Sequence, residues 1–197
     1  MDLQQRVFRY FEMSIDAQKE TAASLSGDIV RAAELITECL LRGGKVLSCG
    51  PAASAGQAQY FAAALLNRFE RERPGLPAIC ISNDSHILTA IANDSSFREI
   101  YAKQIKTLGQ QSDILLLICA GRTTRSVLEA VRAAHERGMA VVALSGDDGA
   151  EIADLLQSGD VELRVSAHRT ANAQETHLVL INILCDLIDT QIFGDES

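Results

Sequence analysis

Apolar residues recur along this chain in two alternating patterns, which predict helices separated by short buried strands. Apolar positions three or four residues apart predict helices over residues 2–24 and 27–42, and Gly43 and Gly44 are expected to end the second one. Continuously apolar runs predict strands covered on both faces, because such a strand has no polar side. The predicted strands are residues 45–49, 78–82, 113–119, 140–146 and 160–165.

Helical patterns fill the segments between these strands. They cover residues 54 to about 69, 85–92, 97–107, 124–137, 149–157 and 170–192. Ser54 is expected to cap the first of these helices, and Thr123 or Thr124 the fourth. Strands that alternate with helices form a parallel sheet with helices on both faces. The sequence therefore predicts an α/β protein, a three-layer α/β/α sandwich around a five-stranded parallel sheet.

The predicted elements form one domain over residues 1–197, with a helical N-terminal region at 1–42 and the α/β core with its long last helix at 43–193. The last helix contains HLVLINILCDLI at residues 177–188, which is apolar almost all round. A helix of this kind needs burial on more than one side. The N-terminal helix carries an apolar stripe made of Leu3, Val7, Phe11 and Ile15. We therefore expect both helices to be buried between subunits of an oligomer.

Composition and charge exclude several classes of protein. Lys and Arg number 18 and Asp and Glu number 26, which gives a net charge of −8. An acidic surface repels phosphate backbones, so a role near DNA has to run through a protein partner, with no direct binding of nucleic acid. No apolar run approaches the roughly 20 residues that span a bilayer, and five cysteines without a CxxC pair are typical of reduced thiols. We expect a cytoplasmic protein with no membrane contact.

Two loops at the carboxyl ends of predicted strands are candidate anion sites, because ligands of parallel α/β proteins bind at this edge. CGPAASAG, residues 49–56, leads to Ser54 at a helix start, where amide groups point outward. It is neither a dinucleotide fingerprint nor a Walker loop, and a tight strand-to-helix turn explains it at least as well. CAGRTTRS, residues 119–126, offers hydroxyl groups with Arg122 and Arg125, and a capped helix with two solvated arginines explains it equally well.

The histidines and cysteines show no catalytic or metal-binding pattern. The four histidines are His86, His135, His168 and His177. His135 is expected at the surface, and the last two are expected to cap the last helix or to be partly buried at its start. Three cysteines end predicted strands and are expected to pack as small hydrophobic residues, namely Cys49, Cys80 and Cys119.

Several segments together resemble the phosphoheptose isomerase branch of the sugar isomerase (SIS) family, over residues 2–193. They are GGKVLSCG, SAGQAQYFAAALLNRFERERPGLPAI, TAIAND, GQQSDILLLI, VVALSGDDG, DVELRV and AQETH. The branch contains isomerases of sedoheptulose 7-phosphate and non-enzymatic members that bind the replication initiator DnaA. The resemblance implies the SIS fold, a homotetramer and a degenerate phosphosugar pocket. Its residues are Ser54, Asn93, Asp94, Thr124 and Gln174.

The resemblance also shows which catalytic groups are replaced. The family's metal-binding histidine corresponds to Tyr60, its metal-binding and catalytic glutamate to Ala64, and a histidine of the last helix to Asn182. Alanine neither binds a metal nor transfers a proton, and asparagine is no general base. Pro51 removes an amide donor from the first loop, and residues 119–121 have lost the hydroxyl groups of the phosphate loop. We expect no metal, no cofactor and no isomerase activity.

The resemblance therefore implies a non-catalytic protein that binds DnaA and promotes its assembly at the chromosomal origin. Ile192 and Phe193 correspond to an apolar pair implicated in initiator contact. The alternative for this pair is that it fastens the helix end to the fold. Two other functions remain open, namely phosphoheptose isomerase and a sensor that binds a sugar phosphate without turnover.

Overall fold

A computed structural model describes residues 2–167 and 169–195, and its centre is a parallel sheet. The strands are β1 (Val46–Cys49), β2 (Ala78–Cys80), β3 (Ile114–Cys119), β4 (Ala140–Ser145) and β5 (Val161–Arg164). They pair in the order β2-β1-β3-β4-β5, and every pairing is parallel. The α/β class and the five strands are confirmed. Because the order changes direction between β1 and β3, the loops that follow these two strands diverge and border the expected ligand position.

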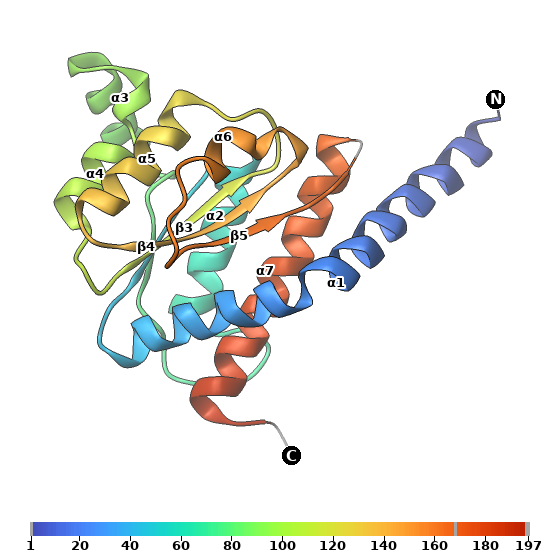
Figure 1. Cartoon of the computed structure of the whole chain (residues 1–197), viewed down its shortest axis with the longest axis horizontal. Coiled ribbons are helices and arrows are strands. Elements are labelled where there is room, and N and C mark those ends of the chain that lie inside the picture. The colour runs from blue at the N-terminus through green and yellow to red at the C-terminus, as the bar shows by residue number, and fades with distance from the viewer. Residues whose placement is uncertain (1, 168, 196–197) are drawn as a thin grey trace.

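Helices cover both faces of the sheet (Figure 1). They are α1 (Leu3–Leu41), α2 (Ala53–Leu66), α3 (Ser85–Asp94), α4 (Ala102–Leu108), α5 (Arg125–Glu136), α6 (Ala150–Ala153) and α7 (Thr170–Phe193), with 3₁₀ turns at Phe97–Glu99 and Asp147–Gly149. Helices α1, α2 and α7 share one apolar cluster with one face of the sheet, and α4, α5 and α6 share a second cluster with the other face. The predicted three-layer sandwich is confirmed.

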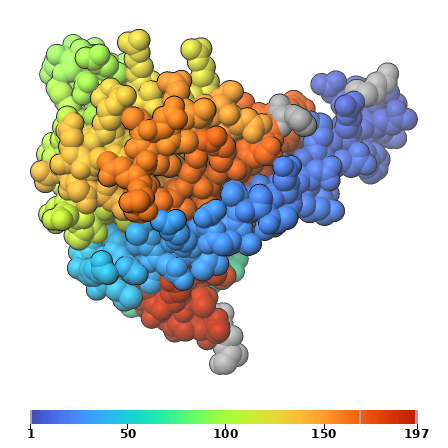
Figure 2. Space-filling view, viewed as in Figure 1, coloured from blue at the N-terminus to red at the C-terminus, as the bar shows by residue number. Residues whose placement is uncertain are grey.

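The N-terminal region is one continuous helix, so the predicted break between residues 2–24 and 27–42 is wrong. Gly27 lies inside α1, where a glycine costs about 1 kcal/mol relative to alanine. Beyond it, Ile29 and Ile36 are buried in the cluster shared with α7, and this packing keeps the helix intact. The first half of α1 extends past the rest of the molecule (Figures 1 and 2).

Other predicted boundaries of helices are wrong for local reasons. Ala52, and not Ser54, occupies the N-cap position of α2. The same helix ends at Leu66 and not near residue 69, because the Arg73 guanidinium binds carbonyl oxygens of its last turn. The predicted helix 149–157 reduces to one 3₁₀ turn and α6. The Asp160 carboxylate accepts a hydrogen bond from the Gln157 backbone amide, and this bond holds the chain in a turn.

The predicted helix 97–107 is a 3₁₀ turn followed by α4. For α5, the structure agrees with the predicted position of the N-cap but not with the expected side-chain bond. Thr124 occupies the N-cap position but makes no side-chain cap bond. The Thr123 hydroxyl donates instead to the Asp148 carbonyl oxygen at 3.1 Å. This bond ties the loop after β3 to the loop after β4.

Helix α7 is the one helix within the described ranges that is long and apolar enough to span a membrane by composition. It contacts α1 and α2 along its length. Leu184, Cys185 and Ile188 on its inner face are fully buried in the core, which accounts for its apolar composition.

Candidate functional site

The loops after β1 and β3 meet at the carboxyl edge of the sheet. Gly50 lies so close to β3 that a Cβ atom there would be 2.4 Å from the Ile118 carbonyl oxygen, so only glycine fits. The Tyr101 hydroxyl donates to the Gly50 carbonyl oxygen at 2.8 Å. The Ala120 amide donates to the Ser54 hydroxyl oxygen at 3.4 Å, and Ser54 is buried. The predicted pocket serine therefore holds two loops together.

The turn before α2 has a backbone conformation that suits glycine, although alanine stands there. Ala52 has φ 50° and ψ −124°. A side-chain-bearing residue in such a sparsely populated region stores on the order of 1–3 kcal/mol of strain. By the resemblance, this position belongs to a glycine in the isomerases. The loop thus carries a methyl group at a position with a glycine-type conformation and, at Pro51, lacks an amide donor.

Tyr60 on α2 and Asn182 on α7 contact each other directly. The Tyr60 hydroxyl donates to the Asn182 side-chain oxygen at 2.9 Å. One turn further along α2, Ala64 is buried and presents only a methyl group. One turn back, the Gln57 side chain donates to the Gln174 carbonyl oxygen at 2.7 Å. The two helices therefore bring together the positions that the resemblance assigns to metal binding and catalysis.

These positions do not fit the metal ion that the isomerase resemblance implies. A phenol bonded to an amide, and a methyl group, supply no pair of metal ligands. Over residues 2–167 and 169–195, no group of three or more His, Cys, Asp or Glu side chains is placed to hold a metal ion. The arrangement offers hydrogen-bonding groups but no general base.

The other predicted pocket residues lie on three different helices or their caps. Asn93 and Asp94 are exposed at the end of α3, none of whose residues is buried. The exposed Thr124 hydroxyl lies 2.9 Å from the Ser126 hydroxyl. Gln174 is half-buried. No hydrogen bond among the described residues joins these groups to one another or to Ser54, so the structure does not bring the predicted pocket residues into one network.

The cysteines at the strand ends pack as predicted. Cys49 and Cys119 are buried in the apolar cluster shared with α5, and Cys80 is half-buried. Burial raises the pKa of the Cys119 thiol to about 11 and also raises the pKa of Cys49. Both thiols are therefore protonated at neutral pH and are not nucleophiles.

Two histidines differ from their predicted surroundings. His177 is fully buried on α7, and its Nε2 lies 3.0 Å from the Ser145 carbonyl oxygen. Burial lowers the pKa of His177 to about 4, which keeps the ring neutral. The His135 side chain is only 14% exposed, so the predicted surface position is wrong. Its Nε2 lies 2.8 Å from the carboxylate of the buried Asp160. His168 lies outside the described residues.

The end of α7 is anchored to the segment after α2. Arg73 and Asp189 form a buried ion pair at 2.9 Å. The Arg71 guanidinium lies 5.7 Å from the Phe193 ring centre and donates to the Gly194 carbonyl oxygen at 2.6 Å. Ile192 and Phe193 are half-buried against the core. Ile192 and Phe193 are therefore fixed in position and remain partly exposed to solvent.

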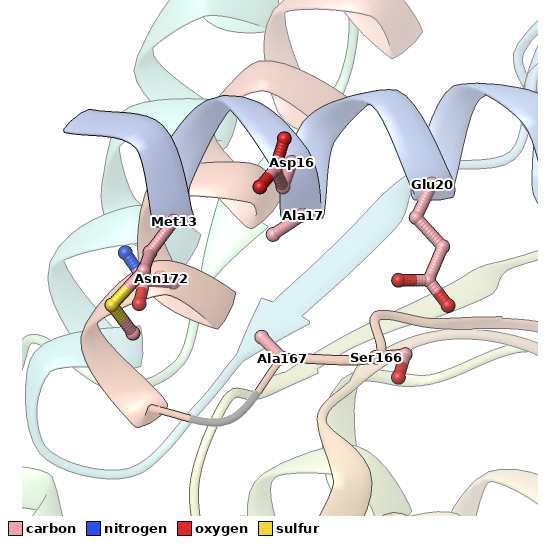
Figure 3. A pocket seen from close by; sticks show the side chains of 7 residues that line it. All are labelled: Met13, Asp16, Ala17, Glu20, Ser166, Ala167 and Asn172. Carbon is pink, nitrogen blue, oxygen red and sulfur yellow. The ribbon is translucent and has the colours of Figure 1, made fainter. Parts of the chain in front are cut away.

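Cavities also line α1, which the sequence did not predict. A cavity of about 180 Å³ separates α1 from the segment between β5 and α7, and Figure 3 shows Glu20 extending toward Ser166 across it. An apolar groove of about 280 Å³ lies between α1 and α7 and includes Ile29, Val30 and Ile183. A third cavity, lined by arginines, lies near the start of α1. No local pattern reveals such features, because they join segments far apart in the chain.

Known proteins resemble this chain over nearly its whole length. The SIS domain family model matches residues 9–146. A phosphoheptose isomerase of Alkalilimnicola ehrlichii is 51% identical over 194 residues, covering 98% of this chain and 99% of that protein. The DnaA initiator-associating protein DiaA of Shigella flexneri serotype 5b is 48% identical over 195 residues, covering 99% and 100%. The solved phosphoheptose isomerase from Francisella tularensis has a TM-score of 0.93 at 43% identity, covering 96% and 100%.

Proposed function

The chain belongs to the SIS domain family, and from that premise we propose that it is a non-catalytic, cytoplasmic member that binds the replication initiator DnaA and promotes its assembly at the origin. Overall similarity does not separate the two functions, since an isomerase and a DiaA protein match at 51% and 48% identity. The observation that carries the proposal is the closed contact between Tyr60 and Asn182, with Ala64 beside it.

Isomerisation of sedoheptulose 7-phosphate needs a group that moves a proton between neighbouring carbons of the sugar. The hydroxyl of Tyr60 already donates to Asn182, and Ala64 has no ionisable group. We expect no turnover of sedoheptulose 7-phosphate by the purified protein and no zinc in metal analysis. The combined substitution Tyr60→His, Ala64→Glu and Asn182→His is expected to restore traces of zinc binding. Turnover by the unmodified protein at an enzyme's ordinary rate would refute the proposal.

A sugar-phosphate sensor is the second function to test. It is supported by Thr124 and Gln174, two polar residues that the resemblance assigns to the phosphosugar pocket. The Ala120 amide already donates to the Ser54 oxygen, and Pro51 offers no amide, so the two loops have fewer backbone donors free for a phosphate. Calorimetric titration with sedoheptulose 7-phosphate distinguishes this function from DnaA binding. Saturable binding together with no capture of DnaA would favour the sensor.

The proposed contact surface for DnaA is Ile192 and Phe193. Apolar side chains that anchor an interface combine a rigid position with an open face, and an aromatic ring is a frequent anchor. Phe193 is held by Arg71 and remains partly exposed. The test is capture of the organism's own DnaA on the immobilised protein. Wild-type protein should retain DnaA, and a Phe193→Ala variant should retain much less.

A homotetramer is part of the proposal, since several initiator molecules could then be held together through avidity. In a single chain, apolar residues of the projecting half of α1 are exposed, namely Leu3, Val7, Phe8, Phe11 and Ile15. Exposed apolar stripes of this size mark interfaces. Sedimentation should show a tetramer, which Phe11→Asp dissociates. Phe97→Asp is the matched control, because Phe97 is 68% exposed and Phe11 is 64% exposed.

A further inference from the structure

The cavity near the start of α1 is lined by three arginines, on a protein whose net charge is −8. Its volume is about 350 Å³, and its lining residues are Arg6, Arg9, Tyr10, Met13 and Arg169. The Arg169 guanidinium lies over the Tyr10 ring, 4.9 Å from its centre, so the two segments are joined at this point.

The guanidinium groups of this cavity lack carboxylate partners. Within the described parts of the chain, the ion pairs found involve other residues. Asp16 and Glu20 line the neighbouring cavity, which shares only Met13 with this one. The basic region therefore ends where the acidic one begins, and three cations remain available to an anion.

We propose that this cavity binds the phosphate group of a small molecule, at a site distinct from the degenerate phosphosugar pocket. Guanidinium groups bind phosphate oxygens through two parallel hydrogen bonds, which suits arginine better than any other side chain to this role. The volume falls within the range of about 300–1,000 Å³ that is typical of small-molecule sites. Tyr10 supplies an aromatic wall beside the charges.

The cavity lies next to the loop whose phosphate-binding hydroxyl groups are missing. Arg169 precedes Thr170, and a Cβ atom placed on Gly121 would lie 3.3 Å from the Thr170 methyl group. A phosphate-bearing molecule in the arginine cavity would thus be near the β3 loop without using it. The site does not depend on the proposed role in initiator binding.

Burial of the Phe11 side of α1 leaves the Arg9 side of the helix open. Successive residues of a helix are about 100° apart around its axis. Arg9 and Phe11 consequently lie about 200° apart, on nearly opposite sides of α1. A second copy that covers Phe11 therefore leaves the Arg9 side of α1 accessible, whereas Leu3 lies only about 60° from Arg6 around the axis.

The test uses the intact protein and inorganic pyrophosphate at low ionic strength, followed by calorimetry and by tyrosine fluorescence. The chain has three tyrosines and no tryptophan, so Tyr10 contributes a large part of the signal. We expect saturable binding that weakens at least tenfold in Arg6→Gln/Arg9→Gln and severalfold in Arg169→Lys. Tyr10→Phe should abolish the fluorescence change while changing affinity less than threefold.

The matched control is Arg122→Gln/Arg125→Gln, which removes the same charge from the β3 loop and its helix. It should change pyrophosphate affinity less than twofold. Equal weakening in this control would place the anion in the family pocket or assign it to general charge, and would overturn the proposal. Absence of saturable binding would do the same. Dissociation of the oligomer by Arg6→Gln/Arg9→Gln would instead assign the arginines to an interface between copies.

Discussion

The carboxyl edge of the sheet and the outer half of α1 differ in what their side chains contact within one chain. At the edge, polar groups bind one another, as in the bond from Tyr60 to Asn182 and the bond from Ala120 to Ser54. Along α1, Phe8 and Phe11 are mostly exposed, and the arginine cavity has no carboxylate partner among the described residues. In the region that the resemblance assigns to isomerase chemistry, the Tyr60 hydroxyl and the Ala120 amide are thus already bonded, although the buried Gln57 side-chain oxygen has no partner among the described residues. The outer half of α1 instead presents exposed apolar side chains and arginines without ion pairs in the described chain. This difference favours binding over catalysis.

The largest expected effect tests the anchoring of α7. Arg73→Ala leaves the Asp189 carboxylate buried without its partner, which should lower the free energy of unfolding by about 3–5 kcal/mol. Denaturant unfolding at fixed protein concentration measures it. Arg68→Ala is the control, because its pair with Glu72 is exposed and should contribute less than about 1 kcal/mol. Equal effects of the two substitutions would show that the end of α7 is not held by this ion pair.

The next effect concerns the buried end of the same helix at acid pH. The pKa of His177 is lowered from 6.5 to about 4 in the folded chain, so the unfolded chain binds a proton first as pH falls. The contribution of the neutral His177 ring to the free energy of unfolding is therefore complete above pH 6.5. It decreases by about 3 kcal/mol as the pH falls toward 4.

The measurement is the free energy of unfolding between pH 7 and pH 4, compared with a His177→Gln variant. The variant lacks the titrating ring, so the difference between the two curves should shrink by about 3 kcal/mol over this range. Parallel curves would mean that the ring is accessible to protons in the folded protein.

A smaller effect is expected at the proposed initiator surface. Phe193→Ala should weaken DnaA binding by about 2 kcal/mol, the range of an aromatic interface anchor, and leave the tetramer intact. Surface plasmon resonance measures the affinity and sedimentation the assembly. Phe97→Ala, an exposed phenylalanine of a different element, should leave affinity unchanged. A dissociated tetramer, or unchanged DnaA affinity, would show that Phe193 only fastens the helix end.

The smallest effect sharpens the description of the altered loop. Ala52→Gly should raise the free energy of unfolding by about 1 kcal/mol, because glycine adopts φ 50° without steric strain. Thermal unfolding should show a higher midpoint. Ala63→Gly is the control, since that exposed residue lies inside α2, and the substitution should lower the free energy of unfolding by about 0.5–1 kcal/mol. A lower midpoint for Ala52→Gly would mean that the turn relaxes in solution.

The sequence by itself determined the class of fold, and through the family resemblance it predicted which catalytic groups are replaced. Continuously apolar runs identify strands of a parallel sheet because both faces must be covered. The replacements at Tyr60, Ala64 and Asn182 follow from motif positions, which need no coordinates. The helix boundaries were harder to predict from the sequence. Gly27 favours a break in α1, but packing of α1 against α7 prevents it.

Only the tertiary structure decided which of these residues meet. Tyr60 and Asn182 are 122 positions apart, and Arg73 and Asp189 are 116 apart. Arg169 joins Tyr10 across most of the chain. Local periodicity describes which face of an element is apolar, but it carries no information on which elements become neighbours. The order of the strands and the packing of α7 against α1 and α2 decide which elements become neighbours. The contacts of Tyr60 with Asn182 and of Arg73 with Asp189 arise from this arrangement.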